Sequence, residues 1–318
     1  MSYPVTIIIP NFNGAHLLRR NLPSVIEAAN HYTGGASILV VDDGSSDDSL
    51  QVLKQEFPQV RVIVHLENRG FAEAVRSGVY AAETEYLLLL NSDVQPAADS
   101  IQPLIEYFED ATVFSVCPCV FDEDGKLDRH AWNVRRYCHG SLKLVPWKLE
   151  NAREKRRHSR LKTLYASGGS MLVRKSMFEA LGGFHPLFKP FYSEDYDLGL
   201  RAWRRGWASY FEPESRMTHQ KRGAIKENVN RNRVKRIRRR NNYLLEWIHM
   251  PLWRLLLVIL PMTILQLLGE LILLDRVNVA GFFTAIPHIP AVLAERRKLH
   301  ETDKLTMNQV VRMVAENC

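Results

Sequence analysis

The stretch VTIIIPNFNG at residues 5–14 decides the fold class. A run of apolar, mostly β-branched residues stops at a proline, two asparagines and a glycine, which is typical of a buried strand that ends in a turn. Residues 15–30 then carry apolar side chains near helical spacing. This N-terminal stretch therefore predicts a buried strand followed by a helix.

The strand–helix unit repeats along the chain. Further strands are predicted at 37–41, 61–64, 85–90 and 172–173. Helices are predicted at 48–56, 71–82, 176–181 and 194–205, with Ser46 or Asp47 as the N-cap of the first of them. The less regular segment 113–172 includes a basic part at 153–162, which we expect to be a solvated loop or helix. Apolar strands that alternate with helices indicate an α/β fold with a parallel sheet covered by helices.

Polar residues follow several of the predicted strands. These positions are Asn11 and Asn13, Asp42 and Asp43, Asn68, and Asn91 and Asp93. Ligands of such sheets bind beyond the carboxyl ends of the strands, and carboxylate oxygens suit Mg²⁺ or Mn²⁺, which usually bridge phosphates. The sequence DDGS at 42–45 is also a good turn, so each acid alone has a structural explanation. Three acids at the same edge of the sheet favour a site that binds a metal ion or ribose hydroxyls.

Composition excludes several classes of protein. The 318 residues are 46% hydrophobic and 24% charged, which argues against a disordered chain and leaves room for two domains. The cysteines, Cys117, Cys119, Cys138 and Cys318, are too few and too irregular for a disulfide framework. The N-terminus has no basic segment followed by an apolar one, as a secretory signal would. We therefore expect reduced thiols and a cytosolic main body.

Charge is distributed unevenly along the chain. Residues 1–150 carry a net charge of −8, residues 151–218 carry +6, and residues 219–318 carry +9. An acidic first half with a basic second half argues against a uniform nucleic-acid binder. The pattern suits a metal or sugar-nucleotide site in the first half and an anionic surface or acceptor near the second.

Short motifs occur in a fixed order: IIPNFNG at 8–14, VVDDGSSD at 40–47, ENRGFA at 67–72, LNSD at 90–93, SGGSMLV at 167–173, LGGF at 181–184, SEDYDL at 193–198, and His219 followed by Gly223. Together they resemble the family 2 glycosyltransferases, and most closely their rhamnosyltransferase-like branch. The resemblance implies the GT-A fold, with a mostly parallel sheet flanked by helices. We expect a GT-A domain at 1–225 and a basic and apolar helical extension at 226–318.

The resemblance implies a donor site for a nucleotide-diphosphate sugar. Pro10 and Asn13 would line the pocket for the base, Asp42 would accept from the base or ribose, and Asp43 would support Asp42. Asn68 and Gly70, with Phe71, would form the wall beside the nucleotide. Asn91-Ser92-Asp93 occupies the place of the family's D-x-D motif, so Asp93 would hold Mg²⁺ or Mn²⁺ with His219 as the second ligand. Arg222 or Lys221 would lie near the diphosphate.

The resemblance also implies roles for the acids at 194–195. Asp195 would be the general base that takes the proton of an acceptor hydroxyl, and Glu194 would position the acceptor or raise the pKa of Asp195. Direct displacement would invert the anomeric centre. The structural alternative is a charged helix N-terminus. An alternative function is a catalytically silent protein of the same fold that binds a sugar nucleotide or a glycan.

The C-terminal hundred residues combine basic and apolar segments. Seven Lys or Arg residues lie within 231–240, and an apolar segment follows at 252–274, interrupted by Arg254, Pro261 and Glu270. Basic residues on both sides favour an in-plane helix or a hairpin that returns through 277–293. We expect attachment to an anionic membrane surface at the cytoplasmic face, and a lipid-linked or cell-envelope glycan as acceptor. The alternatives are a helical subdomain packed on the body and a membrane-surface scaffold. Nucleic acid is not expected, because no aromatic platform accompanies the basic residues.

Overall fold

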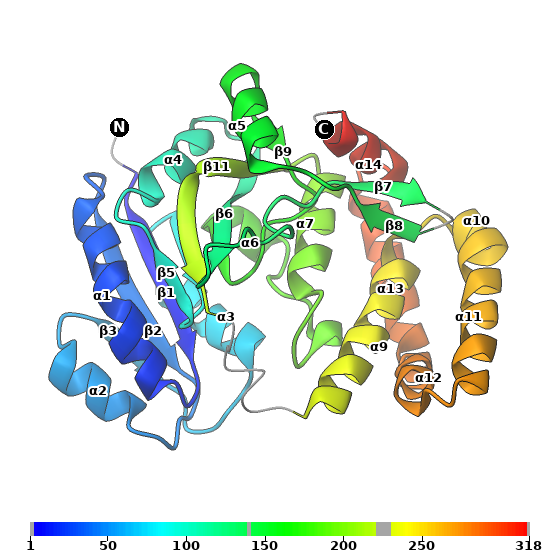
Figure 1. The fold of residues 1–318 in the computed structure, drawn as a ribbon, viewed down its shortest axis with the longest axis horizontal. Coiled ribbons are helices and arrows are strands. Elements are labelled where there is room, and N and C mark those ends of the chain that lie inside the picture. Colours follow the sequence, from blue (N-terminus) through cyan, green and yellow to red (C-terminus); the bar gives the residue numbers. More distant parts are fainter. Residues whose placement is uncertain (1–2, 139–140, 221–229, 317–318) are drawn as a thin grey trace.

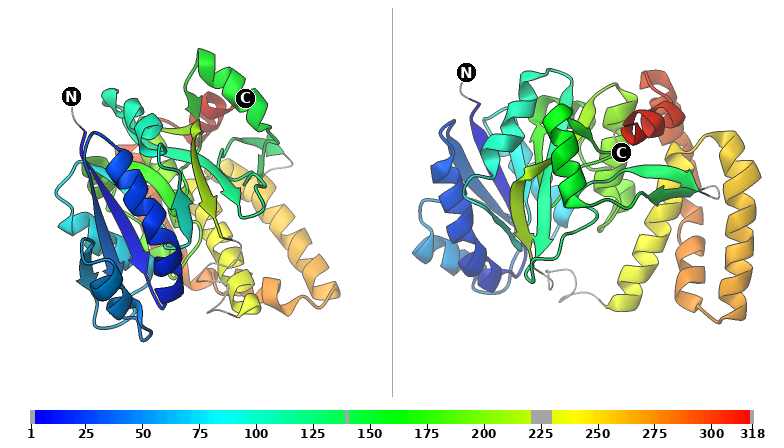
Figure 2. Two further views of the ribbon diagram at one scale, coloured as in Figure 1. Left: turned by 60° about the vertical axis from the view of Figure 1, so that its left-hand side comes forward. Right: turned by 45° about the horizontal axis from the view of Figure 1, so that its top comes forward.

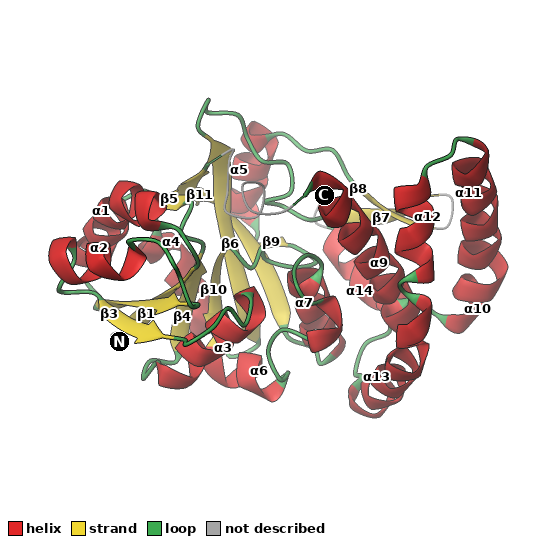
Figure 3. Ribbon diagram, turned by 90° about the horizontal axis from the view of Figure 1, so that it is seen from below, coloured by secondary structure: helices red, strands yellow, loops and turns green. Residues whose placement is uncertain are grey.

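A computed structural model describes residues 3–138, 141–220 and 230–316. Figure 1 shows a body built around a sheet, with a group of helices from the C-terminal part of the chain beside it. In Figure 3, helices α1 and α4 lie on one side of the strands, and α3 and α6 lie on the other. The predicted α/β class is therefore confirmed.

The first half of the body follows the predicted alternation closely. Its elements are β1 (Val5–Asn11), α1 (Ala15–His31), β2 (Ala36–Asp42), α2 (Ser49–Glu56), β3 (Arg61–Val64), α3 (Phe71–Ala81) and β4 (Tyr86–Leu90). Strand β1 pairs in parallel with β2 and with β4, and β2 pairs in parallel with β3. All five residues of β4 are buried, which explains why its sequence is apolar throughout.

Helix α2 begins one residue later than predicted, and Asp47, one of the two predicted capping residues, bonds its first N–H from the position before the N-cap. Asp48 is the N-cap residue, and its side chain makes no capping hydrogen bond. The Asp47 carboxylate lies between two helix starts: Oδ1 accepts from the backbone N–H of Ser49 at 3.0 Å, and Oδ2 accepts from that of Ala15 at 2.9 Å. Because both helix N-termini carry partial positive charge, one carboxylate at this place stabilises α1 and α2 together.

The second half of the sheet contains strands that the sequence pattern did not reveal. Its elements are β5 (Val94–Pro96), α4 (Ile101–Ile105), β6 (Val113–Asp122), α5 (Leu149–His158), β9 (Leu161–Lys162), β10 (Ser170–Arg174), α6 (Lys175–Ala180), α7 (Glu194–Arg204) and β11 (Ala208–His219). The strand order is β3-β2-β1-β4-β10-β6-β11-β5, with β9 on β11. Strand β10 runs antiparallel to β4 and β6, so the sheet is mixed.

The C-terminal part is helical, as expected. It consists of α9 (Arg231–His249), α10 (Leu252–Arg254), a π-helical turn (Leu255–Ile259), α11 (Leu260–Ile272), α12 (Arg276–Phe283), α13 (Ile289–Thr302) and α14 (Met307–Ala315). Helix α9 packs against α12 and α13, and α13 and α14 contact α7 of the body. A hairpin of β7 (Arg135–Cys138) and β8 (Ser141–Leu144) reaches from the body towards these helices (Figure 2).

The apolar C-terminal segments are largely exposed. The stretches Leu252–Ile272 and Arg276–Thr302 are long and apolar enough to cross a membrane, and 17% of each apolar window is buried. On α11 the buried residues are Thr263 and Glu270, whereas Leu268 and Ile272 are exposed. The polarity of α11 is therefore the reverse of that expected for a helix that packs its apolar face on a protein core.

Candidate active site

The sheet topology brings the sequence motifs to one edge. Strands β1, β2 and β4 are parallel, so the residues that follow them lie at the same end of the sheet. The antiparallel strand β10 begins at this end, where Ser170 pairs with Leu90. Strand β11 ends there, where His219 lies between Asp122 of β6 and Val94 of β5. Residues far apart in sequence therefore meet beyond the carboxyl ends of the strands.

Asp42 organises the turn that follows β2. The residue is fully buried, and its oxygens accept hydrogen bonds from Asn11 Nδ2 at 2.9 Å, from Ser45 N at 3.0 Å and from Ser45 Oγ at 2.7 Å. Asn13, with a φ of 50°, accepts from the backbone N–H of Ser46 at 2.8 Å. These bonds join the turns after β1 and β2, next to the half-buried Pro10. Direct contact of Pro10, Asn13 or Asp42 with a nucleotide stays a prediction.

Asp43 holds the neighbouring loop. Its carboxylate lies 2.6 Å from Nδ1 of His65 and accepts from the backbone N–H groups of Arg69 at 3.0 Å and Gly70 at 2.7 Å. Gly44 lies under the same loop with a φ of 74°, and a Cβ there would come within 2.6 Å of the backbone of Glu67. Only glycine fits this position. Asn68, in the same loop, is exposed.

Asp93 and His219 form the candidate metal-binding pair. His219 Nε2 lies 3.4 Å from Asp93 Oδ2. Asp93 is buried, yet its Oδ1 has no hydrogen-bond partner in the described part of the chain, which is costly unless a ligand satisfies it. A carboxylate oxygen and an imidazole nitrogen suit a divalent cation such as Mn²⁺. Among the described residues, no group of three or more His, Cys, Asp and Glu side chains is arranged to hold a metal, so substrate oxygens and water would complete the shell.

Two buried amides that the sequence analysis missed support the Ser92–Asp93 turn. Asn21 Nδ2 donates to the carbonyl of Ser92 at 2.6 Å, and Gln220 Nε2 donates to Asn21 Oδ1 at 2.9 Å. The backbone N–H of Gln220 also donates to the carbonyl of Asp93 at 3.0 Å. Asn21 lies on the apolar face of α1, and a polar residue at such a position signals a hydrogen-bonding role.

Asp195 lies in the first turn of α7. Its Oδ2 accepts from the backbone N–H of Gly168 at 3.2 Å, and its Oδ1 accepts from that of Tyr196 at 2.8 Å. Burial raises the pKa of the Asp195 carboxyl, although these N–H groups oppose the shift. Burial and then the charge of Asp195 raise the pKa of Glu194 to about 8. Glu194 Oε2 is buried and has no hydrogen-bond partner among residues 3–138, 141–220 and 230–316.

The segment that leads into these acids is held from α9. Tyr192 and Ser193 have φ values of 74° and 72°, which are strained for residues other than glycine. The Asn241 side chain, fully buried on α9, donates to the carbonyls of Phe188, Phe191 and Tyr192 at 2.7–2.9 Å. The C-terminal helices therefore fix the approach to Glu194 and Asp195.

A cavity of about 120 Å³ connects His219 of the candidate metal-binding pair with Asp195. Asn91, Asp195 and His219 all line it. Gly169 also lines it, and a Cβ there would come within 2.6 Å of the Asn91 amide, so glycine is needed for Asn91 to enter. Three further polar residues line the cavity, Asp128, His130 and Tyr165, and no motif marks them because they come from the irregular segment 113–172. Arg222 and Lys221 lie outside the described residues.

Three relatives show what the chain is similar to. An N-acetylglucosaminyl-diphospho-decaprenol L-rhamnosyltransferase of Mycobacterium tuberculosis is 28% identical over 205 residues, which is 58% of this chain and 66% of that protein. A pre-mycofactocin glycosyltransferase of the same organism is 29% identical over 70% of this chain and 44% of its own length. The O-antigen chain rhamnosyltransferase RfbN of Salmonella typhimurium is 25% identical over 57% of this chain and 55% of its own length. The chain therefore matches less than two thirds of each relative.

Two solved structures share the fold. The crystal structure of GalNAc-T7 with UDP, GalNAc and Mn²⁺ has a TM-score of 0.59 at 18% identity, and covers 79% of this chain and 49% of that one. The mannosyltransferase PcManGT of Pyrobaculum calidifontis, in complex with GDP-Man and Mn²⁺, has a TM-score of 0.52 at 18% identity, and covers 76% of this chain and 62% of that one. These similarities confirm the predicted GT-A fold.

A family model described as glycosyl transferase family 2 matches residues 6–182, more than half of the chain. The matched region includes the turns after β1, β2 and β4 that carry Asn13, Asp42 and Asp93. Together with the similarity to the two rhamnosyltransferases, this match confirms the predicted resemblance. The chain belongs to the family 2 glycosyltransferases.

Proposed function

We propose that this glycosyltransferase moves a sugar from a nucleotide-diphosphate donor to a hydroxyl of a lipid-linked or cell-envelope glycan, with inversion at the anomeric centre. The observation that carries the proposal is the pair Asp93–His219, in which a buried carboxylate oxygen has no hydrogen-bond partner among the described residues. His219 lines the same cavity as Asp195, which supports a site where the leaving diphosphate and the attacking hydroxyl would lie close together.

Asp93 and His219 would hold Mg²⁺ or Mn²⁺, which when bound would offset the charge that develops on the leaving diphosphate. Pro10, Asn13 and Asp42 would shape the pocket for the base and ribose, with Asp43 and Gly70 fixing the loop beside it. Asn68 would contribute from the rim, and Arg222 would lie near the diphosphate. The names of the two solved structures, which contain UDP or GDP-Man with Mn²⁺, support a metal and a nucleotide sugar.

Asp195 would act as the general base. General bases work best when their pKa lies near the working pH, and catalysis of this kind typically contributes about 10²–10⁴-fold. Burial raises the pKa of Asp195 above its ordinary value and so towards the working pH. Glu194 would position the acceptor or keep that pKa high through its own charge. The alternative of a charged helix N-terminus suits solvated acids, whereas Glu194 and Asp195 are half-buried and both have a raised pKa.

A membrane surface would present the acceptor. Exposed apolar residues cover α11, and the basic stretch 231–240 forms part of α9. Such a combination suits an anionic bilayer, with about 1 kcal/mol from each basic residue near the surface. One relative is named for a diphospho-decaprenol substrate, which supports a lipid-linked acceptor. We place the enzyme on the cytoplasmic face of the membrane, attached through α10 to α13.

Thermal shift with a panel of UDP-, dTDP- and GDP-sugars, with and without Mn²⁺, tests the donor site. We expect a metal-dependent shift with one donor, which Asp93→Asn abolishes and Asp195→Asn retains. Asp195→Asn should lose transfer to acceptor, whereas Asp99→Asn on the exposed surface should behave as the wild type. An active Asp195→Asn enzyme would remove Asp195 from the mechanism. Donor binding without transfer or donor hydrolysis would instead favour the silent binding protein.

The scaffold alternative needs a separate experiment. If the basic and apolar extension is itself the function, turnover should not depend on the Asp93 and Asp195 site at all. A wild-type protein that transfers sugar to an acceptor in a metal-dependent manner, and that loses this activity in the two variants, would exclude a pure scaffold.

A further inference from the structure

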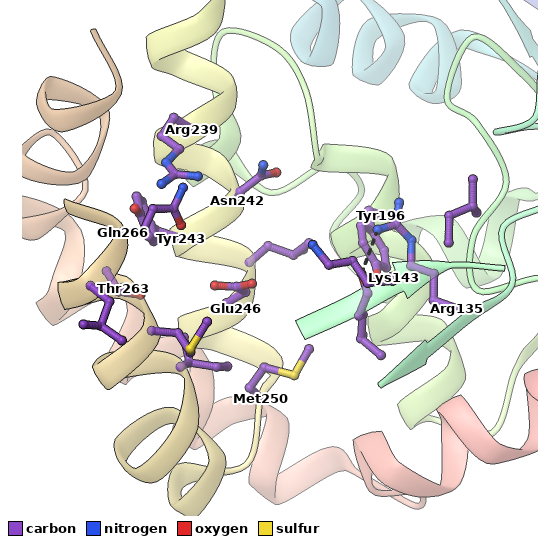
Figure 4. A pocket seen from close by; sticks show the side chains of 16 residues that line it. Arg135, Lys143, Tyr196, Arg239, Asn242, Tyr243, Glu246, Met250, Thr263 and Gln266 are labelled. Atoms are coloured by element: carbon purple, nitrogen blue, oxygen red, sulfur yellow. Dashed lines mark hydrogen bonds between the residues drawn. The ribbon is translucent and has the colours of Figure 1, made fainter. Parts of the chain in front are cut away.

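A second, larger cavity lies between the body and the C-terminal helices. It has a volume of about 920 Å³ and is walled by the β7–β8 hairpin, the first turn of α7, helix α9 and helix α11. Figure 4 shows Arg135, Lys143 and Tyr196 on one side of this groove, with Arg239, Tyr243 and Glu246 along α9 on the other. Of the residues that the structure describes, none of those proposed above for donor, metal or base lines it.

The polar lining carries an excess of positive charge. Arg135, Lys143 and Arg239 face one carboxylate, Glu246, while Arg239 also pairs with Glu270 at 2.8 Å. Burial raises the pKa of Glu246, with Arg239 and Lys143 opposing the shift. In the described part of the chain, Arg135 Nε, Arg239 Nε and Tyr243 Oη are buried without a hydrogen-bond partner. Unsatisfied donors beside surplus cations fit an anionic ligand with several acceptor oxygens.

The groove also has an apolar side, formed mainly by α11 and the turn before it, which continues to the outside of the molecule. Leu142, Ile259, Met262 and Leu265 line it. Met262 is 50% exposed and Leu265 is 63% exposed, so the groove opens at the face of α11 whose other residues are also apolar and exposed. A ligand that combines a charged group with a hydrocarbon chain would match both sides of the groove.

The groove adjoins the cavity of the candidate active site. Tyr196, which follows Asp195, lines the groove, and its ring stacks on that of Tyr165 with centroids 4.5 Å apart. Tyr165 lines the cavity that contains Asp195 and His219. The Arg135 guanidinium lies 4.9 Å from the centre of the Tyr196 ring. A phosphate at Arg135 would therefore be separated from the base by this aromatic pair.

We propose that the groove binds the phosphate-bearing headgroup of the lipid-linked acceptor. Arg135, Lys143 and Arg239 hold the phosphate oxygens, and the lipid chain leaves along the exposed face of α11 into the bilayer. The glycan attached to the phosphate then reaches Asp195 past Tyr165 and Tyr196. This inference rests on the proposed function, because it assigns the acceptor of that same reaction.

Direct binding tests the groove without turnover. The full-length protein in an uncharged detergent is titrated with farnesyl diphosphate by calorimetry, with EDTA present so that no metal recruits diphosphate to Asp93. Farnesyl diphosphate should bind at least about tenfold more tightly than inorganic pyrophosphate or farnesol, because it alone fills both sides of the groove. Lys143→Glu should weaken binding at least about tenfold. Arg135→Gln is a second variant with the same expected direction.

The matched control is Lys54→Glu, the same change of charge at an exposed position on α2 in the part of the body away from the hairpin (Figure 1). Equal affinity of Lys143→Glu and Lys54→Glu would overturn the inference. Pyrophosphate that binds as tightly as farnesyl diphosphate would overturn it as well, since the groove would then be a site for free phosphate. Metal-dependent donor hydrolysis should be the same in Lys143→Glu as in the wild type. Absence of hydrolysis and transfer in the wild type would instead argue against the proposed function.

Discussion

Nε2 of His249 on α9 lies 2.9 Å from Oδ1 of Asp197 on α7, and both side chains are fully buried. Arg201 donates to the other oxygen of Asp197 at 2.7 Å and also to the carbonyls of Leu181 and Gly183. Burial by itself would raise the pKa of Asp197, but Arg201 and His249 lower it to about 2. One ionised carboxylate therefore connects α9 and the LGGF motif to the helix that carries Asp195.

Replacing His249 should destabilise this connection. His249→Ala leaves one oxygen of a buried carboxylate without a partner and opens a cavity, so the free energy of unfolding should fall by about 2–4 kcal/mol. Thermal unfolding of the full chain measures the change. His158→Ala, at a position that is 76% exposed on α5, is the matched control and should leave the midpoint unchanged. Equal midpoints for the two variants would contradict the role given to His249.

The acid pair predicts a pH dependence of transfer. The pKa of Glu194 is raised to about 8, and that of Asp195 is raised by burial. A base must be deprotonated, so kcat/KM should rise with pH through the raised pKa of the pair and level off above it. Glu194→Gln removes the group whose pKa the charge of Asp195 raises to about 8 and leaves Asp195 to titrate alone, so this rise of kcat/KM should move to lower pH.

Rate profiles between about pH 5.5 and 9 with a saturating donor test this dependence. Glu150→Gln, an exposed position at the start of α5, provides the control and should keep the wild-type profile. If kcat/KM of Glu194→Gln rises at the same pH as that of the wild type, the two carboxyl groups do not influence one another during transfer.

Gly44 offers a test of the loop that we propose lies beside the nucleotide. Gly44→Ala introduces strain at a φ of 74° and a clash with the backbone of Glu67 and Asn68. We expect a loss of stability of roughly 2 kcal/mol or more and weaker donor binding, because the loop must move. Gly125→Ala has the same φ of 74° but open space around its Cβ. It should cost about 1 kcal/mol and leave donor affinity intact. Similar donor affinity in both variants would rule out a role of this loop.

Membrane attachment can be tested on the exposed apolar face. Leu257 is 73% exposed and Leu273 is 80% exposed. The double change Leu257→Asp and Leu273→Asp should lower binding to anionic vesicles more than about tenfold, since each buried leucine contributes about 1.5–3 kcal/mol. Flotation with the vesicles measures bound protein. Leu66→Asp, at a 97% exposed position on the body, should bind as the wild type does. Unchanged flotation of the double variant would place the contact elsewhere.

The sequence predicted the first half of the sheet because each strand there is an uninterrupted apolar run. It did not predict β6, whose apolar run contains Pro118, or β11, in which Glu212, Pro213 and Glu214 interrupt the pattern. Both strands are stabilised by pairing with each other, with a register shift between Glu212 and Arg216. Such pairing between distant segments leaves no local signal.

The candidate site was predictable to a different degree. Strand ends and the family motifs pointed to Asp93, His219 and Asp195, but Asn21 and Tyr165 carry no motif and gain their roles only from packing. The groove between the hairpin and α9 was likewise beyond sequence reasoning, because its walls come from four separate elements. Periodicity describes one element at a time, and a site made by several elements needs their arrangement.

The three hydrogen bonds of Asn241 have a consequence for truncated forms of the protein. The motifs end near residue 225, and a protein shortened there would keep every residue proposed for chemistry. It would lose the amide that holds the carbonyls of Phe188, Phe191 and Tyr192. The strained backbone at Tyr192 and Ser193 would then lose this support, and the orientation of the proposed base Asp195 would no longer be fixed. The helices that we propose to contact the membrane thus also hold the segment that leads into the candidate active site.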